Sequence, residues 1–182
     1  MYDIMVLYIL RHEKRDLKKI DYFAPLNMIG KHYSKTSLYS KFHDIDIEEI
    51  YSSPYKRALD TVDTISVSKK VPIKIDWALA EKVVNTNTSA MNWPDNEQQE
   101  DLHILYDIDK KYKPTADINY ISSYDESLEK YITRVDTFSQ FIETQKNKNI
   151  LIVTHKCVTD RLIENLTGNK ISLAMGDCYE VC

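Results

Sequence analysis

Two histidines of this chain directly follow short apolar runs, at the positions where strands of a sheet are expected to end. Residues 6–10 read Val-Leu-Tyr-Ile-Leu before Arg11 and His12, and residues 150–154 read Ile-Leu-Ile-Val-Thr before His155. Both runs are typical of buried parallel strands. Ligands of open α/β sheets bind at the carboxyl ends of the strands. We therefore expect both imidazoles at the edge of the sheet that such folds use for chemistry.

Two arginines complete a candidate cluster with these histidines. Ser53 and Pro54 predict an N-cap and a first helical position, which places Arg57 in the first turn of a helix. A cation there opposes the helix dipole, so Arg57 either reaches into water or meets an anion at the helix start. Arg11, Arg57 and the two imidazoles repel one another unless an anion joins them or the imidazoles are neutral.

The residue types of this cluster favour phosphoryl chemistry. A guanidinium presents paired donors to phosphate oxygens, and a neutral imidazole can attack phosphorus. The chain has only three glycines, at positions 30, 168 and 176, and no glycine-rich phosphate loop. Side chains, rather than backbone amides, are therefore expected to hold a phosphate.

Composition narrows the kind of protein further. The 182 residues are 43% hydrophobic and 29% charged, as in ordinary globular proteins. A net charge of −4 and a pI near 5.7 argue against nucleic acid or a membrane surface as partner. No apolar run approaches the roughly 20 residues of a membrane span, and the start of the chain does not resemble a signal peptide. Cys157, Cys178 and Cys182 lack metal-ligand spacing, which favours a reducing, cytoplasmic location.

Helices and strands are expected to alternate through the first half of the chain. The pattern predicts a helix over 26–42, a strand over 47–52, a helix from Ser53 to about Lys70 and a strand over 73–77. Residues 83–122 break this rhythm because they are rich in Asn, Asp and Tyr. We interpret them as an inserted, lid-like excursion with one helix near 97–106. Its aromatic residues are expected either to line the site or to pack the lid: Trp93, Tyr106, Tyr112 and Tyr120.

The second half of the chain gives the clearest helix signal. Ser123 and Glu126 resemble a capping box, and one apolar stripe follows at helical spacing: Leu128, Tyr131, Ile132, Val135, Phe138 and Ile142. A strand over 150–154 and a helix over 158–166 closed by Gly168 come next. The alternation predicts an α/β fold with a mostly parallel sheet, formed as one domain over residues 1–182.

Six segments, taken in order, match a known family. They are Leu10-Arg11-His12, Pro25-Leu26 with Gly30, residues 50–61 around Ser-Ser-Pro-Tyr-Lys-Arg-Ala, Leu79-Ala80-Glu81, Glu126-Ser127-Leu128 with Arg134-Val135, and Ile152-Val153-Thr154-His155. Together they resemble the signature segments of the histidine phosphatase superfamily, which includes the phosphoglycerate mutases. The resemblance implies a phosphoglycerate mutase-like three-layer α/β/α sandwich.

The resemblance also implies a two-step reaction on a small phosphorylated substrate or a phosphoprotein. His12 is implied as the nucleophile that forms a phosphohistidine, bracketed by Arg11, Arg57 and His155. Charge stabilisation of this kind is usually the largest catalytic contribution. Glu81 is implied as the general acid, although a glutamate after a strand is also common as a simple surface residue. No metal or cofactor is implied.

Three departures from the family pattern leave alternatives open. Glu13 stands where a glycine usually follows the nucleophile. It is expected either to point towards the anion, where Lys14 or Arg15 would neutralise it, or to turn to solvent. Lys156 follows the second histidine, and Lys18 replaces an asparagine common in the family. The leading hypothesis is a metal-independent phosphomonoesterase. A phosphoglycerate mutase and an inactive phosphate-binding or interaction module are the alternatives.

Overall fold

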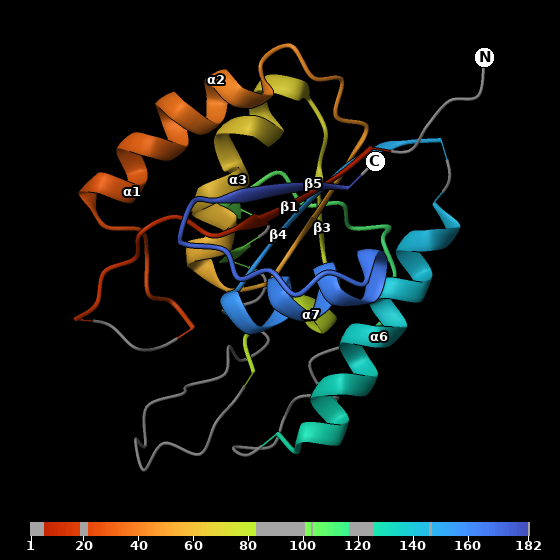
Figure 1. Ribbon diagram of the computed structural model, residues 1–182. Helices are drawn as coiled ribbons and strands as arrows, with labels where there is room; N and C mark the ends of the chain where they lie inside the picture. The colour runs from red at the N-terminus through yellow and green to blue at the C-terminus, as the bar shows by residue number, and fades with distance from the viewer. Residues whose placement is uncertain are drawn as a thin grey trace.

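Five strands in the described part of the chain form one mixed sheet (Figure 1). The computed structural model describes residues 6–18, 22–82, 101–102, 104–116, 126–145 and 147–181. The strands are β1 (Val6–Arg11), β2 (Glu49–Ser52), β3 (Ile73–Ile75), β4 (Asn149–Thr154) and β5 (Cys178–Val181). Their order across the sheet is β3-β2-β4-β1-β5. All neighbours are parallel except β5, which runs antiparallel to β1.

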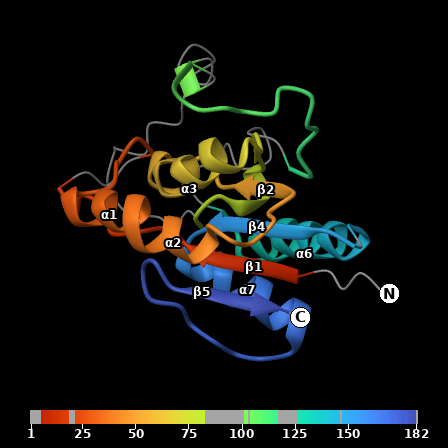
Figure 2. The same cartoon turned by 90° about the horizontal axis from the view of Figure 1, so that it is seen from above.

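Helices cover both faces of this sheet, which gives three layers (Figure 2). One face carries α1 (Met28–Tyr33), the π-helical turn η1 (Ser34–Leu38), α2 (Tyr39–Phe42) and α3 (Lys56–Lys69). The other face carries α6 (Leu128–Thr144) and α7 (Lys156–Thr167), while the 3₁₀ turn η2 (Trp77–Leu79) follows β3. The predicted α/β/α sandwich with a mostly parallel sheet is confirmed.

The two central strands, β1 and β4, bring the histidines together. Their inner residues are fully buried, as expected for strands covered on both faces. Burial of each Leu or Ile side chain contributes about 1.5–3 kcal/mol. In the parallel register Arg11 lies opposite Thr154, and the His12 amide donates to the Thr154 carbonyl at 2.9 Å. His12 and His155, each the next residue of its chain segment, therefore leave the sheet side by side.

The start of α3 differs from the prediction. The helix begins at Lys56 with Tyr55 as its N-cap residue, two positions later than the predicted N-cap at Ser53. The Ser53 amide donates to the Val153 carbonyl at 2.9 Å, and the Ser53 hydroxyl is hydrogen-bonded to His155. The amide and the hydroxyl of Ser53 are thus both engaged in contacts with the end of β4. Arg57 still lies in the first turn of α3, as predicted.

The later helices follow the prediction with three corrections. The N-cap of α6 is Ser127, whose hydroxyl accepts from the Lys130 amide, and Ser123 lies outside the described residues. Leu128 is 60% exposed because it precedes the buried stripe, whereas Val135 is fully buried. Helix α7 starts earlier than expected and ends at Gly168, whose φ of 73° is the left-handed conformation that glycine favours.

Part of the expected excursion, residues 104–116, packs along the β3 edge of the sheet. Ile108 forms a parallel bridge with Ile73, and the Tyr106 hydroxyl donates to Asp60 of α3 at 2.6 Å. Residues 101–102 and 104–105 are helical, within the predicted helix, while Trp93 and Tyr120 lie outside the described residues. None of the helices described here is long and apolar enough to cross a membrane.

Candidate active site

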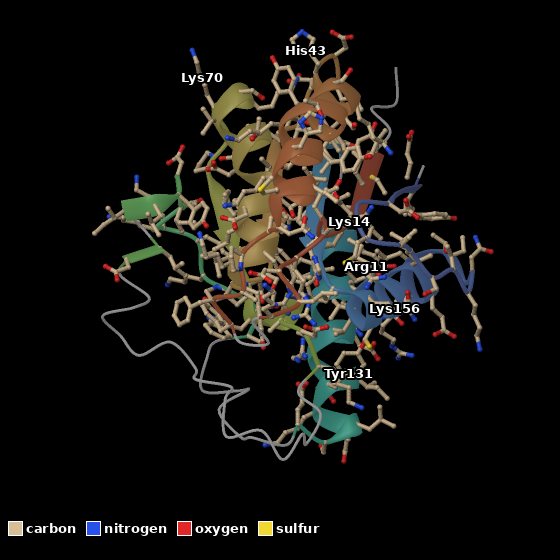
Figure 3. All side chains as sticks on the ribbon, turned by 90° about the vertical axis from the view of Figure 1, so that its left-hand side faces the viewer. Arg11, Lys14, His43, Lys70, Tyr131 and Lys156 are labelled. Atoms are coloured by element: carbon tan, nitrogen blue, oxygen red, sulfur yellow. The ribbon has the colours of Figure 1, made fainter. Side chains whose placement is uncertain are left out.

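The carboxyl ends of β1 and β4 place two imidazole rings against each other. The ring centroids of His12 and His155 are 5.1 Å apart, and both side chains are buried. Figure 3 shows Arg11 near the middle of the molecule and His43 at its upper end. The structure thus groups the two histidines that follow strands and leaves His43 apart from them.

Hydrogen bonding fixes the tautomer of His12. Its Nδ1 lies 2.7 Å from the backbone carbonyl oxygen of Glu13. A carbonyl only accepts, so Nδ1 carries the proton and donates it. In the neutral ring Nε2 then keeps its lone pair. A histidine held in this way is ready to act as a nucleophile through Nε2.

Burial and neighbouring cations keep both imidazoles neutral. Burial, followed by the charge of Arg57, lowers the pKa of His12 from 6.5 to about 3. The same two causes hold the pKa of His155 well below its usual value. The repulsion expected among two guanidiniums and two imidazoles is therefore relieved by neutral rings.

His155 is held by Ser53, the residue predicted as a helix cap. The Ser53 hydroxyl lies 2.8 Å from His155 Nε2 and also accepts from the Tyr55 amide. Where the Ser53 hydroxyl donates to Nε2, the ring carries its proton on Nδ1. No described residue lies within hydrogen-bond distance of Nδ1, and Glu81 Oε2 is 3.8 Å away. In this tautomer His155 Nδ1 is a donor available to an anion.

Arg57 and Glu81 complete what we call the histidine cluster, namely His12, Arg57, Glu81 and His155. The buried guanidinium of Arg57 bonds to Glu81 Oε2 and lies 4.4 Å from the centroid of the Tyr55 ring. Glu81 is partly exposed, so its carboxyl also meets solvent. Tyr55 packs on His155 as well, with 4.9 Å between centroids. The structure therefore places Glu81 beside Arg57 and His155, with which the family resemblance grouped it.

Arg11 lies at the border of the histidine cluster. One of its terminal nitrogens donates to the Leu173 carbonyl at 2.8 Å, while its buried Nε has no partner among the described residues. Its charge contributes to the lowered pKa of His12. Lys156, the first residue of α7, pairs with Asp160 at 3.5 Å and is half exposed. Arg11 has donor capacity left for an anion, and Lys156 is already paired.

Glu13 packs against a turn and not against the histidine cluster. A Cβ built on Gly176 would lie 2.5 Å from Glu13 Oε1, so the carboxyl occupies the space that this glycine leaves free. The Lys14 amide donates to Glu13 Oε2 at 3.3 Å, and the Glu13 amide donates to Thr61. Burial raises the pKa of Glu13 and the charge of Asp177 adds to this, while Lys14 lowers it. The Glu13 side chain is thus buried against Gly176, and the expected alternative in which it turns to solvent is wrong.

Two contributors to this site were missed from the sequence. Ser53 positions His155, although its place before Pro54 suggested a helix cap. Arg15 was considered only as a neutraliser of Glu13, yet its charge acts on His12, Arg57 and His155. Its position three residues after His12 was the one feature of the sequence that could have indicated this effect.

The donor set of the site suits an anion better than a metal ion. Among the described residues, no group of three or more His, Cys, Asp or Glu side chains could hold a metal ion. His12 Nδ1 is hydrogen-bonded to the Glu13 carbonyl, and His155 Nε2 is hydrogen-bonded to the Ser53 hydroxyl. The remaining groups are guanidinium and imidazole donors, which match phosphate oxygens.

The lowered histidine pKa values predict that the protein loses stability in mild acid. Below about pH 6.5 the unfolded chain protonates His12, whereas the folded chain does so only near pH 3. The free energy of unfolding should thus have its full value above pH 6.5 and decrease as the pH falls towards 3. This decrease is up to about 1.4 kcal/mol per pH unit for each such histidine. Urea denaturation between pH 7.5 and 4 measures this slope. His12→Asn should make it shallower and His32→Asn, at an exposed histidine, should not; equal slopes in all three proteins contradict the assignment.

Comparison of the whole fold with solved structures identifies its class. The phosphatase fold of the ecdysone phosphate phosphatase from Bombix mori matches with a TM-score of 0.72 and 15% identity, covering 97% of this chain and 88% of the other. The alpha-ribazole phosphatase from Shigella flexneri matches with a TM-score of 0.69 and 21% identity, covering 97% and 89%. The phosphoserine phosphatase from Entamoeba histolytica matches with a TM-score of 0.63 and 19% identity, covering 97% and 90%. These likenesses establish a shared fold.

The family follows from the sequence as a whole. Residues 7–176 match the model of the histidine phosphatase superfamily, branch 1. The chain belongs to this superfamily, and the resemblance drawn from its six segments is confirmed. Comparison with curated proteins by sequence returned no match.

Proposed function

We propose that this protein is a phosphomonoesterase that acts through a phosphohistidine formed on His12. The observation that carries the proposal is the hydrogen bond from His12 Nδ1 to the Glu13 carbonyl. It leaves the Nε2 lone pair free in a neutral ring beside Arg57 and His155. Membership in a superfamily of phosphatases and mutases supports the same chemistry.

In the first step, His12 Nε2 attacks phosphorus and the ester P–O bond breaks. The leaving alkoxide takes a proton from Glu81. Arg57, Arg11 and His155 Nδ1 donate to the non-bridging oxygens, where charge is concentrated in the transition state. A phosphate that engages Arg57 displaces the Glu81 carboxyl from it.

In the second step, a water molecule attacks phosphorus and the P–N bond breaks. Glu81 accepts the proton from this water. The products are inorganic phosphate and neutral His12, with Glu81 again protonated. The site thereby returns to its initial state, and the two steps together hydrolyse one ester bond.

A p-nitrophenyl phosphate assay with and without EDTA tests this proposal. We expect turnover that survives EDTA and falls at least about 10³-fold in His12→Asn, the scale on which losing a nucleophile acts. His32→Asn, at an exposed histidine on α1, is the matched control and should keep full activity. Rapid quenching in alkali should trap a phosphoryl group on the wild-type and His32→Asn proteins and none on His12→Asn. Absence of turnover between pH 4 and 9 would favour an inactive phosphate-binding module.

The acid role of Glu81 predicts a dependence on the leaving group. Glu81→Gln should slow hydrolysis of an alkyl phosphate roughly 10²–10⁴-fold, because an alkoxide needs a proton to leave. It should lower kcat/KM for p-nitrophenyl phosphate far less, since p-nitrophenolate leaves without one and kcat/KM reports the first step alone, before Glu81 is needed as the base for water. Steady-state kinetics on both substrates measure this contrast. Equal losses on the two substrates would assign Glu81 to positioning Arg57 instead.

A further inference from the structure

Thr154, the last residue of β4, is linked to three members of the histidine cluster. It is fully buried and directly precedes His155. Its carbonyl accepts from the His12 amide at 2.9 Å. Its hydroxyl donates to the Leu79 carbonyl at 2.6 Å, two residues before Glu81. Thr154 is thus joined through its backbone to both histidines and through its side chain to the segment that carries Glu81.

The hydroxyl of Thr154 serves this second link and not the sheet. The four residues before it, 150–153, are Ile, Leu, Ile and Val, and all are fully buried. Valine has the branched shape of threonine and suits such a strand equally well. A buried hydroxyl is costly unless it is hydrogen-bonded, and here its partner is the carbonyl of Leu79, at the end of η2. The polar group therefore ties the end of β4 to residues outside the sheet.

Arg134 holds the same segment from α6. Its buried guanidinium donates to the Ala78 carbonyl at 2.5 Å. Its Nε and Nη2 donate to the two carboxylate oxygens of Glu126, which is also buried. A paired contact of this kind fixes the plane of the guanidinium, so that the third nitrogen stays directed at Ala78. The carbonyls of two successive residues, 78 and 79, are therefore anchored by two different elements of the fold.

One residue, Ala80, separates these anchored carbonyls from Glu81. Ala80 is fully buried and has extended backbone angles, with φ −62° and ψ 148°. Glu81 follows it and is partly exposed; its carboxyl bonds to Arg57 and lies 3.8 Å from His155 Nδ1. The chain between the anchors and Glu81 is thus short and enclosed, so the place of the carboxyl follows from that of the anchored carbonyls.

We propose that Thr154 and Arg134 are positioning residues that hold the Glu81 carboxyl on Arg57. The consequence for catalysis rests on the proposed function, in which Glu81 is the general acid. A misplacement of about 1 Å near a reacting group can cost 10²-fold in rate. The Glu81 carboxyl also occupies a guanidinium that phosphate needs, so a displaced Glu81 leaves Arg57 more open to phosphate. Loss of positioning therefore predicts slower turnover together with tighter phosphate binding, a combination that general damage to the fold would not produce.

Thr154→Val tests the proposal, because it removes the hydroxyl and keeps the shape of the side chain. Calorimetric titration of the full chain with inorganic phosphate at pH 7.5 measures the affinity. Glu81→Gln should bind phosphate about tenfold tighter than the wild-type protein, the low end of the effect of one nearby charge, and Thr154→Val about threefold tighter. Thr154→Ser keeps the hydroxyl and should bind as the wild-type protein does. So should Thr159→Val, the matched control, because the equally buried Thr159 hydroxyl bonds to the Lys156 carbonyl instead.

Kinetics on two substrates give a second measurement. Thr154→Val should lower kcat/KM for an alkyl phosphate roughly 10-fold to 10²-fold and for p-nitrophenyl phosphate far less, the same contrast that is expected of Glu81→Gln. Thr154→Ser should restore most of the loss. Arg134→Lys keeps the charge and loses the planar fork, so it should change affinity and rate in the same directions. Its melting temperature shows whether the altered buried ion pair still permits folding, and Thr154→Val decides the proposal if it does not.

The affinity pattern and the activity can fail separately. The proposal is overturned if the wild-type protein does not bind phosphate, if Thr154→Val binds it no tighter than the wild-type protein, or if Thr159→Val tightens binding equally. A protein that shows the expected affinities and hydrolyses neither ester would support the positioning of Glu81 and refute the proposed hydrolysis.

Discussion

Arg57→Ala is expected to lower kcat/KM for a phosphate monoester by roughly 10³-fold or more. A buried guanidinium that contacts a transferring phosphoryl group supplies an effect of this size. Arg57 is buried, lies on the Tyr55 ring and bonds Glu81, so solvent cannot replace its charge. Steady-state kinetics with p-nitrophenyl phosphate measure the loss.

The conservative variant distinguishes geometry from charge. Arg57→Lys keeps one positive charge and loses the planar fork, so we expect it to recover only part of the activity. Arg161→Lys is the matched control, because Arg161 makes a paired bond to Asp136 on the far helices. It should be as active as the wild-type protein. An Arg57→Ala protein that is folded and retains a tenth of the wild-type rate would remove Arg57 from the mechanism.

Gly30→Ala is expected to destabilise the protein by about 3 kcal/mol, the upper range for overpacking a filled site. A Cβ on Gly30 would collide with the backbone carbonyl oxygen of Lys14 and would lie 3.0 Å from its nitrogen and carbonyl carbon. In a helix, Ala is otherwise favoured over Gly by about 1 kcal/mol, so here the clash reverses the sign. Urea denaturation measures the change.

The same substitution should also reduce turnover. The segment that must move carries Glu13, whose carbonyl fixes the His12 tautomer, and a misplacement of about 1 Å near a reacting group can cost 10²-fold in rate. Gly168→Ala is the control: its φ of 73° is strained for alanine, but no atom lies within 4 Å. It should lose about 1 kcal/mol and keep its rate. Equal activity of the two variants would contradict the role given to Gly30.

Much of the fold was predictable because its signals are local. The runs before Arg11 and His155 are apolar throughout, and only strands buried on both faces need such runs. Gly168 closes α7 as predicted, because its left-handed conformation is a local requirement. The five residues proposed for the site were also identified from sequence. Their roles, and the single-domain organisation over 1–182, remain predictions.

What could not be predicted depends on contacts between distant segments. Ser53 looks like a helix cap from its neighbours, yet His155, 102 positions later, takes its hydroxyl. The orientation of Glu13 depends on Gly176, which the sequence places 163 residues away. Tyr22, Trp77 and Tyr112 line one pocket although they are far apart in the sequence. Periodicity and capping rules contain no information about such pairings.

Because the Glu13 side chain packs on Gly176, positions 13 and 176 cannot both hold large side chains. Gly176 also has a φ of 84° and donates to the carbonyls of Arg11 and His12, so its backbone cannot easily move away to admit a side chain. A relative with a larger residue at 176 must therefore carry a small one at 13, and this chain has the reverse arrangement. A variant enlarged at 176 would therefore need a smaller residue at 13 in the same protein.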